Sequence, residues 1–195
     1  MQDPRARGRR TLLIVAAVFF VPVIAAFALY YGEVWRPAGS SSKGELITPA
    51  RPLEIAGLRN PDGTPAAPGV LADKWTLIYI GDGACDADCR AALVYGRQSR
   101  LALNNEMTRV QRVFLATGNC CAHDYFAAEQ PGLLVLDASA AAALLGEFPA
   151  DRSRSLFIVD PLGNLMMRHD AGVANQTSKD LLTDLKKLLK LSHIG

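Results

Sequence analysis

The sequence predicts an α/β domain, a central mixed sheet flanked by helices, that follows one N-terminal transmembrane helix. Three observations support this fold class. Residues 11–31 carry no charged side chain over a length that can cross the ~30 Å hydrocarbon core of a bilayer. Two continuous apolar runs, residues 74–81 and 110–117, are typical of strands buried on both faces, and a helical segment separates them. A hairpin pattern and an amphipathic helix then end the chain.

The first ten residues carry four arginines and a single acid, Asp3. Because basic residues that flank a membrane helix stay in the cytoplasm, residues 1–10 should be cytoplasmic. The triplet AFA, Ala26–Ala28, resembles a signal-peptide cleavage site, so a cleaved signal peptide is the alternative. The apolar run extends past this triplet and exceeds the usual core of about 7–15 residues. We therefore favour an uncleaved, single-pass anchor at residues 11–31, in contact with the lipid of the inner membrane, and a domain in the periplasm.

Residues 32–52, which are rich in glycine, serine and proline, are predicted to form a flexible linker. The following residues, 53–195, are enough for one domain with its own core. Beyond the arginine-rich start, acidic and basic residues nearly balance. The formal net charge of +2 therefore gives no support for nucleic-acid binding.

The domain alternates between strand and helix patterns. Residues 53–64 indicate a short strand followed by a turn at Pro61-Asp62-Gly63. After the buried strand at 74–81, a helix should run from about residue 86 to about residue 105, with a break near Gly96. The strand at 110–117 precedes a loop or short helix at 119–131, and residues 132–139 are interpreted as a short strand or a link.

The end of the chain has two clear signals. Residues 155–170 contain two apolar runs around a turn at residues 160–164, which predicts a hairpin. The last helix should span residues 177–193, where Thr177 and Asp180 offer a capping box and five leucines form one apolar stripe. A strand, a cysteine-bearing helix, a strand, a hairpin and a terminal helix, in this order, are the elements of the thioredoxin fold. We therefore expect a thioredoxin-like domain.

All four cysteines are expected at the same edge of this sheet, because the loops that follow parallel strands gather there. Cys85 and Cys89 follow the first buried strand, whereas Cys120, Cys121 and His123 follow the second. The two segments should then lie within about 15 Å of each other, a few strand spacings plus the reach of a loop. Arg152, just before the hairpin, should approach the same edge.

Cys85 and Cys89 either share a helix face or lie in a loop that can close into a disulfide. Cys85 should lie at the helix N-terminus, which lowers the pKa of a thiol and favours the attacking thiolate. Three nearby acids, Asp82, Asp86 and Asp88, act in the opposite direction. The structural alternative is a staple, but closing so short a loop removes little entropy from the unfolded chain. A redox or metal function is therefore favoured.

Cys120, Cys121 and His123 form a short cluster whose soft donors suit Cu(I) or zinc. Because a bridge between neighbouring cysteines is strained, each of them could pair with a different partner instead. The alternative is that one or both are small, buried apolar residues. His169 and His193 have no clustered partners in the sequence, and each is interpreted as a surface or packing residue.

Two segments, CDADC at residues 85–89 and FIVDPLGN at residues 157–164, resemble motifs of the Sco family. These Sco/SenC-like proteins are thioredoxin-like, membrane-anchored proteins of cytochrome c oxidase assembly. The resemblance implies copper delivery or thiol redox chemistry at Cys85 and Cys89. Arg152 stands where the family has its copper-ligating histidine, and a guanidinium group has no lone pair for a metal. The chain is therefore similar to a divergent Sco protein that lacks this ligand.

The leading hypothesis is a membrane-anchored, Sco-like thiol–disulfide protein that assists cytochrome c oxidase assembly, in which Cys85 attacks and Cys89 resolves. Such a protein is a candidate thiol–disulfide oxidoreductase, and its partners would be respiratory oxidase subunits or assembly factors. One alternative is a Cu(I) metallochaperone that uses Cys85 and Cys89, with Cys120, Cys121 and His123 as additional ligands. Another is a non-catalytic scaffold that keeps the fold. A positive charge at Arg152 would stabilise a Cys85 thiolate and repel copper, which favours redox chemistry.

Overall fold

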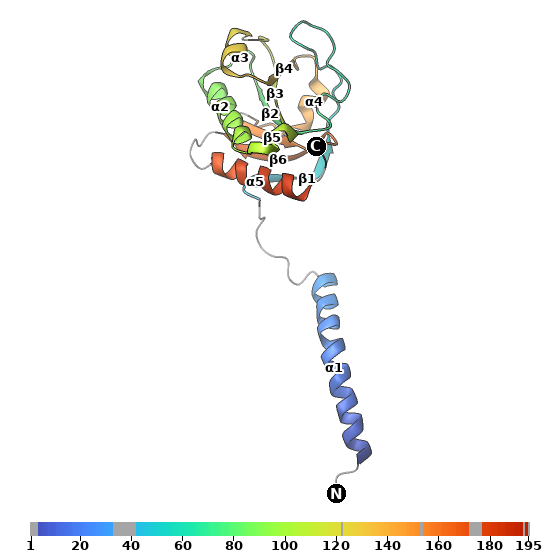
Figure 1. The fold of residues 1–195 in the computed structure, drawn as a ribbon. Helices are drawn as coiled ribbons and strands as arrows, with labels where there is room; N and C mark the ends of the chain where they lie inside the picture. The colour runs from blue at the N-terminus through green and yellow to red at the C-terminus, as the bar shows by residue number, and fades with distance from the viewer. Residues whose placement is uncertain are drawn as a thin grey trace. The chain divides into compact units, whose positions relative to one another are not determined.

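The computed structural model describes residues 4–32, 42–121, 123–152, 154–171, 177–192 and 194. The chain divides into two compact units, Met1–Ser41 and Ser42–Gly195. Within its described residues the first unit holds one helix, and the second unit holds the α/β domain (Figure 1).

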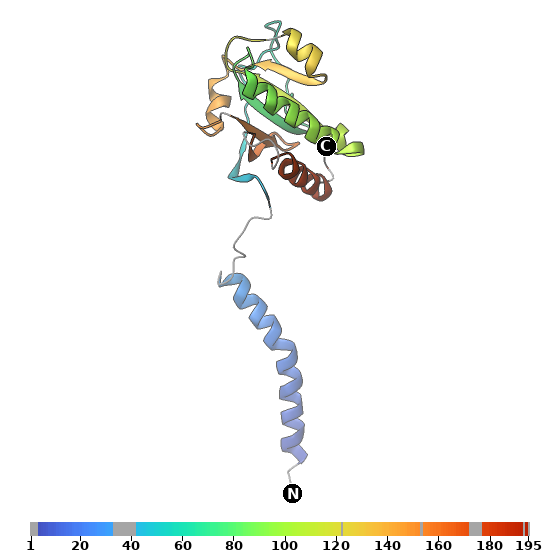
Figure 2. The same ribbon diagram turned by 90° about the vertical axis from the view of Figure 1, so that its left-hand side faces the viewer.

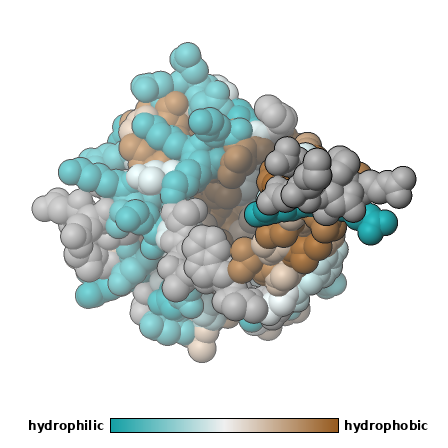
Figure 3. Space-filling model, turned by 90° about the horizontal axis from the view of Figure 1, so that it is seen from below, coloured by the Kyte–Doolittle hydropathy of each residue, from teal (hydrophilic) through white to brown (hydrophobic). Residues whose placement is uncertain are grey.

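Helix α1 spans Pro4–Tyr31 and includes Pro22. Its segment Gly8–Tyr31 is long and apolar enough to cross a membrane. Consecutive side chains from Leu12 to Val15 are all exposed, so the helix is apolar on every side, and part of this surface is visible in Figure 3. A helix that is apolar all round needs an apolar environment, which a bilayer supplies.

Six strands of the described chain form one mixed sheet with the order β1-β6-β5-β2-β3-β4. Strands β2, β3 and β4 are parallel, whereas β5 is antiparallel to β2 and to β6, and β6 is antiparallel to β1. The predicted mixed sheet and the predicted hairpin are therefore confirmed. The strands are β1 Glu45–Pro52, β2 Trp75–Gly81, β3 Val110–Ala116, β4 Leu133–Asp137, β5 Ser155–Val159 and β6 Asn164–Asp170.

Helices cover both faces of the sheet (Figure 2). On one face, Leu77 and Tyr79 of β2 pack in a cluster with residues of α2 and α5. On the other face, Ile78 and Ile80 pack with Leu144 of α4. Successive side chains of a strand point to opposite faces, so a strand covered on both sides reads as a continuous apolar run. The helices are α2 Ala87–Leu101, the 3-10 helix η1 Asn104–Arg109, α3 His123–Glu129, α4 Ala142–Glu147 and α5 Thr177–Leu191.

The sequence interpretation was wrong at the start of the domain. Residues 45–52, which we expected in the flexible linker, form β1 at the edge of the sheet. Residues 53–64, where we expected a short strand, contain only an isolated pairing of Arg59 with Pro65 and Asp137. Strand β1 is mostly exposed and contains two prolines, both features of edge strands, so it lacks the apolar alternation that identifies a strand.

Helix α2 also differs from its prediction. It runs without a break through Gly96 and ends at Leu101, where a 3-10 helix follows after a short turn. Gly96 is buried against Leu156 of β5, so the glycine lies where the helix packs on the sheet and does not end it. The segment 119–131, predicted as a loop or short helix, contains α3, and the segment 132–139 contains the short strand β4.

The first residues of the domain lie against a buried ionisable pair, His169 and Asp184. The backbone N–H groups of Lys43 and Gly44 donate to Oδ2 of Asp184 at 2.7 and 2.8 Å. Nε2 of His169 lies 3.5 Å from the same oxygen, and both side chains are almost fully buried. A Cβ at Gly44 would lie 2.6 Å from this nitrogen, so only glycine allows the approach. His169 is therefore a packing residue, as predicted.

We expect the stability of the domain to fall as the pH falls below about 6.5. Burial lowers the pKa of His169, although Asp184 and Asp180 act in the opposite direction. The unfolded state therefore binds a proton more readily, and stability that is present above the unfolded pKa is lost as the pH falls toward the folded pKa. Urea denaturation between pH 8 and pH 5 measures this slope. A His169→Gln variant should show a flatter slope, and equal slopes would contradict the prediction.

Candidate functional site

The candidate site lies where the loops after β2 and β3 meet. The N–H of Gly83 donates to the carbonyl of Gly118 at 2.8 Å, and the N–H of Thr117 donates to the carbonyl of Gly81 at 2.9 Å. Nδ2 of Asn119 donates to Oδ2 of Asp82 at 2.9 Å. The two cysteine-bearing segments therefore share one edge of the sheet, as predicted from the parallel strands.

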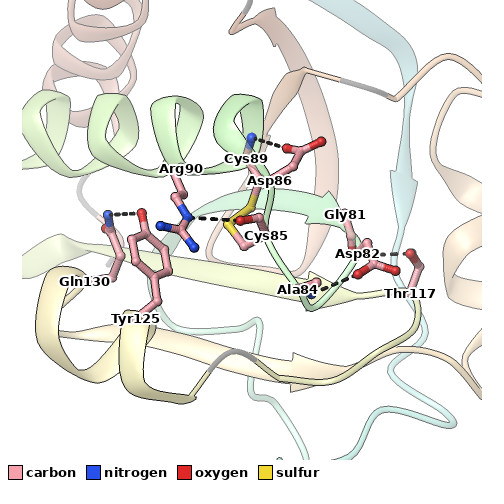
Figure 4. Close-up of a disulfide and its surroundings, with 10 residues drawn as sticks. All are labelled: Gly81, Asp82, Ala84, Cys85, Asp86, Cys89, Arg90, Thr117, Tyr125 and Gln130. Carbon is pink, nitrogen blue, oxygen red and sulfur yellow. Dashed lines mark hydrogen bonds between the residues drawn. A yellow bond between two sulfur atoms is a disulfide. The ribbon is translucent and has the colours of Figure 1, made fainter.

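Cys85 and Cys89 form a disulfide with a Cα–Cα distance of 5.2 Å (Figure 4). Both residues are buried, with 1% and 3% of their surface exposed. Asp86 is the N-cap of α2 and accepts a hydrogen bond from the N–H of Cys89 at 2.9 Å. We expected Cys85 at the helix N-terminus, but it precedes the cap. Because the cap residue lies between the cysteines, Cys89 occupies the first turn of α2 instead.

The N-cap supports one of the cysteines directly, so Asp86→Ala should destabilise the domain by about 1 kcal/mol. The loss would come from the unpaired N–H of Cys89. The matched control is Asp88→Ala two residues later, where the exposed carboxylate makes only a surface ion pair and the loss should stay below about 0.5 kcal/mol. Urea denaturation of the oxidised proteins measures both. Equal losses would contradict the assignment of the cap.

Cys85 has a left-handed backbone, with φ of 49°, and Arg154 across the cleft has φ of 54°. Such conformations cost residues other than glycine about 1–3 kcal/mol each and persist only where surrounding contacts impose them. At Cys85 one such contact is the Nε of Arg90, which donates to the Cys85 carbonyl at 3.1 Å. Strained backbone of this kind is concentrated at functional sites, so these two residues support a function at the disulfide.

Arg90 begins a chain of contacts that connects the disulfide to the core (Figure 4). Its guanidinium lies 4.4 Å from the ring centroid of Tyr125 in α3. The hydroxyl of Tyr125 accepts from Nε2 of Gln130 at 3.3 Å, and Oε1 of Gln130 accepts from Arg112 of β3 at 2.8 Å. Burial lowers the pKa of Arg112 to about 10. The sequence did not predict this chain, because its members come from distant segments without a shared spacing.

An open cleft of about 620 Å³ lies beside the disulfide. Both cysteines line it, together with a set of charged residues: Asp82, Asp86, Asp88, Arg152 and Arg154. Because Arg152 lines this cleft, it approaches the same edge as predicted, and its Nη1 donates to the carbonyl of Leu145 at 2.7 Å. Burial, and then the charges of Asp86 and Asp88, raise the pKa of Tyr79 in the same cleft to about 12.

Arg154 is a site residue that the sequence analysis missed. Its guanidinium binds Oδ2 of Asp88 through Nε at 2.9 Å and through Nη2 at 2.5 Å, with both side chains more than half exposed. The local sequence has arginines at positions 152 and 154, and the interpretation considered only the first. Two cations therefore face the three acids that we expected to disfavour a thiolate.

Cys120 and Cys121 also form a disulfide, with each other. We considered that each could pair with a different partner, which is wrong, or that one or both are small, buried apolar residues, which does not hold for Cys120. Cys120 is exposed, and Cys121 is half-buried against the apolar cluster that contains Cys85 and Cys89. The loop after β3 brings the two sulfurs together. The sequence argument, that a bridge between neighbouring cysteines is strained, did not predict this. The side chain of His123 and all of His193 lie outside the described residues.

With the cysteines in disulfides, the described residues offer no grouped ligands for a copper or zinc ion. Within them, no three His, Cys, Asp or Glu side chains are grouped so that they could hold a metal. All four cysteines are bonded in disulfides, and only the thiolate form is a strong metal ligand. His169 lies on β6, where it is buried beside Asp184 of α5, and it does not join the cysteines. Arg152, which lines the cleft, has no lone pair for a metal.

Two family models match the chain. The model described as the transmembrane-like, thioredoxin-like C-terminal domain matches residues 75–192, and the model of the transmembrane-like N-terminal domain matches residues 2–33. No curated protein matches the sequence. The first model covers the sheet from β2 onward together with α5, and the second covers the apolar helix α1.

Several solved structures share the fold. The apo Sco1 protein of Thermus thermophilus is 22% identical, with a TM-score of 0.61 over 77% of this chain and 99% of its own. Yeast Sco1 with copper bound is 16% identical, with a TM-score of 0.57 over 79% and 96%. BsSco, a member of the Sco family of cytochrome c oxidase assembly proteins in which a disulfide switch was identified, is 16% identical, with a TM-score of 0.53 over 74% and 96%. The predicted thioredoxin-like, Sco-like fold is therefore confirmed.

Proposed function

Because this chain belongs to the family of the transmembrane-like, thioredoxin-like C-terminal domain, we propose that it is a membrane-anchored thiol–disulfide protein. Its Cys85–Cys89 pair would cycle between disulfide and dithiol on the periplasmic side of the inner membrane. The observation that carries this proposal is the Cys85–Cys89 disulfide itself, which lines an open cleft at the edge of the sheet. The cycle would assist the assembly of cytochrome c oxidase.

A purely structural role explains this disulfide poorly. Its closed loop contains only the three residues between the cysteines, so closure removes little entropy from the unfolded chain. Cys85 itself has a left-handed backbone, and the pair lies in a cleft lined by two arginines. The arginines offset part of the charge of the three acids in the same cleft, and positive charge near a thiol favours its thiolate, the form that attacks a disulfide. These features support a pair that exchanges.

In the chemical step, one thiolate of the reduced pair attacks a disulfide sulfur of the partner. The partner's other sulfur leaves as a thiolate, and the second cysteine of the pair then attacks the mixed disulfide. The partner gains two electrons and two protons, and Cys85–Cys89 is oxidised. We assign the attack to Cys85 and the resolving step to Cys89. Cys85 lies in the loop before the cap, whereas Cys89 is held in the first turn of α2 by the hydrogen bond of its N–H to Asp86.

Two arguments support the periplasmic location that we propose. Disulfides persist in oxidising compartments, which suits a chain whose four cysteines lie in two bridged pairs. Basic residues also dominate the segment before the apolar helix, which favours a cytoplasmic N-terminus. The role in oxidase assembly rests on the shared fold with BsSco, whose family is one of cytochrome c oxidase assembly proteins. The partners would be oxidase subunits or assembly factors.

Complementation tests the proposal. In cells that lack this chain, the double variant Cys85→Ser/Cys89→Ser should restore no more cytochrome c oxidase activity than an empty vector, at equal protein level. The matched control introduces two serines on exposed positions of the same helix, Ala87→Ser/Ala91→Ser, and should restore full activity. Full activity of the cysteine variant would overturn the redox proposal and favour the non-catalytic scaffold. A reduced protein that binds Cu(I) stoichiometrically and loses it in the variant would favour the metallochaperone instead.

A further inference from the structure

We propose that Cys120–Cys121 is a second redox site, which exchanges electrons with a protein dithiol and transfers them to the buried Cys85–Cys89 disulfide. This inference rests on the proposed redox function of Cys85–Cys89. It assigns a role to the two cysteines that the proposed chemistry leaves unused.

The exposure of the two pairs is opposite. Cys85 and Cys89 have only 1% and 3% of their surface exposed, whereas Cys120 is exposed and Cys121 is half-buried. Thiol–disulfide exchange requires the attacking thiolate to reach a sulfur, so its rate depends on access. A folded protein partner can therefore reach the Cys120–Cys121 sulfurs more readily than the buried pair.

The loops that carry the two pairs are in direct contact. The Gly83–Gly118 backbone hydrogen bond and the Asp82–Asn119 side-chain hydrogen bond join them. A Cβ added at Gly83 would lie 2.7 Å from the Cα of Cys120, so the two backbones touch at this point. Cys121 packs against the same apolar cluster as Cys85 and Cys89. The half-buried Cys121 therefore packs on the cluster that holds the buried pair, whereas Cys120 is exposed.

The transfer balances as two exchange reactions. A protein dithiol reduces Cys120–Cys121 and leaves as a disulfide. The Cys121 thiolate then attacks Cys85–Cys89, forms a mixed disulfide and releases one thiolate of that pair. Cys120 attacks the Cys121 sulfur of the mixed disulfide, which re-forms Cys120–Cys121 and releases the second thiolate. In total, two electrons and two protons pass from the protein dithiol to Cys85 and Cys89.

A trapping experiment tests the central step in the full chain in detergent. The variant Cys89→Ser/Cys120→Ser keeps only Cys85 and Cys121, and a glutathione redox buffer should convert them into an intramolecular disulfide. Trypsin cleaves after Lys74, Arg90, Arg112 and Arg152, so the product joins peptide 75–90 to peptide 113–152. Mass spectrometry detects this pair of peptides. If Cys85 and Cys121 stay free or form only intermolecular bridges, the relay is excluded.

A kinetic experiment separates the relay from the proposed function. In Cys120→Ser/Cys121→Ser, reduction of Cys85–Cys89 by reduced thioredoxin, used as the protein dithiol, should be at least about ten-fold slower than in the unmodified chain. Reduction by a small phosphine should keep its rate. Equal rates with thioredoxin, or a fall with both reagents, would overturn the relay. Failure of the phosphine to reduce the native pair in the unmodified chain would instead contradict the redox function itself.

Discussion

Asp184→Ala should destabilise the domain by about 2–4 kcal/mol, because it leaves several buried polar groups without a partner. The carboxylate accepts the N–H groups of Lys43 and Gly44, and His169 lies 3.5 Å away. Its own side chain is 1% exposed, so water cannot replace these contacts without opening the structure. Urea denaturation at pH 7.5 measures the loss. The same change should release the segment before β1, detectable as faster amide hydrogen exchange at residues 43–46.

The matched control is Asp180→Ala, one turn earlier on α5. Asp180 is half-buried, and no hydrogen bond to the entering chain involves it among the described contacts. Its replacement should cost less than about 1 kcal/mol. If Asp184→Ala and Asp180→Ala destabilise the domain equally, Asp184 is not the residue that anchors the entering chain.

Gly83→Ala should destabilise the oxidised domain by about 1–3 kcal/mol and force the two cysteine loops apart. The new Cβ would meet the backbone of Asn119 and lie 2.7 Å from the Cα of Cys120, and backbone atoms cannot give way as a flexible side chain can. The loss is steric, because Gly83 is not among the residues with positive φ. Urea denaturation measures it.

Gly118→Ala is the matched control in the facing loop. There the nearest atom to an added Cβ is Oδ2 of Asp82 at 3.8 Å, an ordinary contact. This variant should therefore stay within about 0.5 kcal/mol of the unmodified chain. Equal effects of the two substitutions would show that the loops do not touch as the geometry indicates.

Burial determined which strands the sequence could predict. Strands β2 and β3 are covered on both faces, so their apolar runs were visible without any structure. Strand β1 pairs with β6 at the edge and is mostly exposed, so its residues read as a linker. Its place in the sheet depends on pairing with a strand more than a hundred residues away, which no local pattern contains.

The candidate site was predicted only where topology determines it. Parallel strands place Cys85 and Cys120 at one edge, and Arg152 enters beside them. The contacts of Arg90 with Tyr125 and of Arg154 with Asp88 depend on how helices and loops pack in three dimensions. Cys89 lies in the first turn of α2 because the helix is capped at Asp86. A start of the helix one residue earlier or later would change the place of both cysteines relative to the cap.

Equilibrium redox titration of the full chain in detergent tests the central claim, that Cys85–Cys89 exchanges while the domain stays folded. The chain is equilibrated in thiol–disulfide buffers of known potential, and alkylation of peptide 75–90 reports the reduced fraction. We expect a reversible two-electron transition with a midpoint above about −300 mV, and circular dichroism that does not change across it. A pair that stays oxidised until the domain unfolds would contradict the account and make Cys85–Cys89 a structural disulfide.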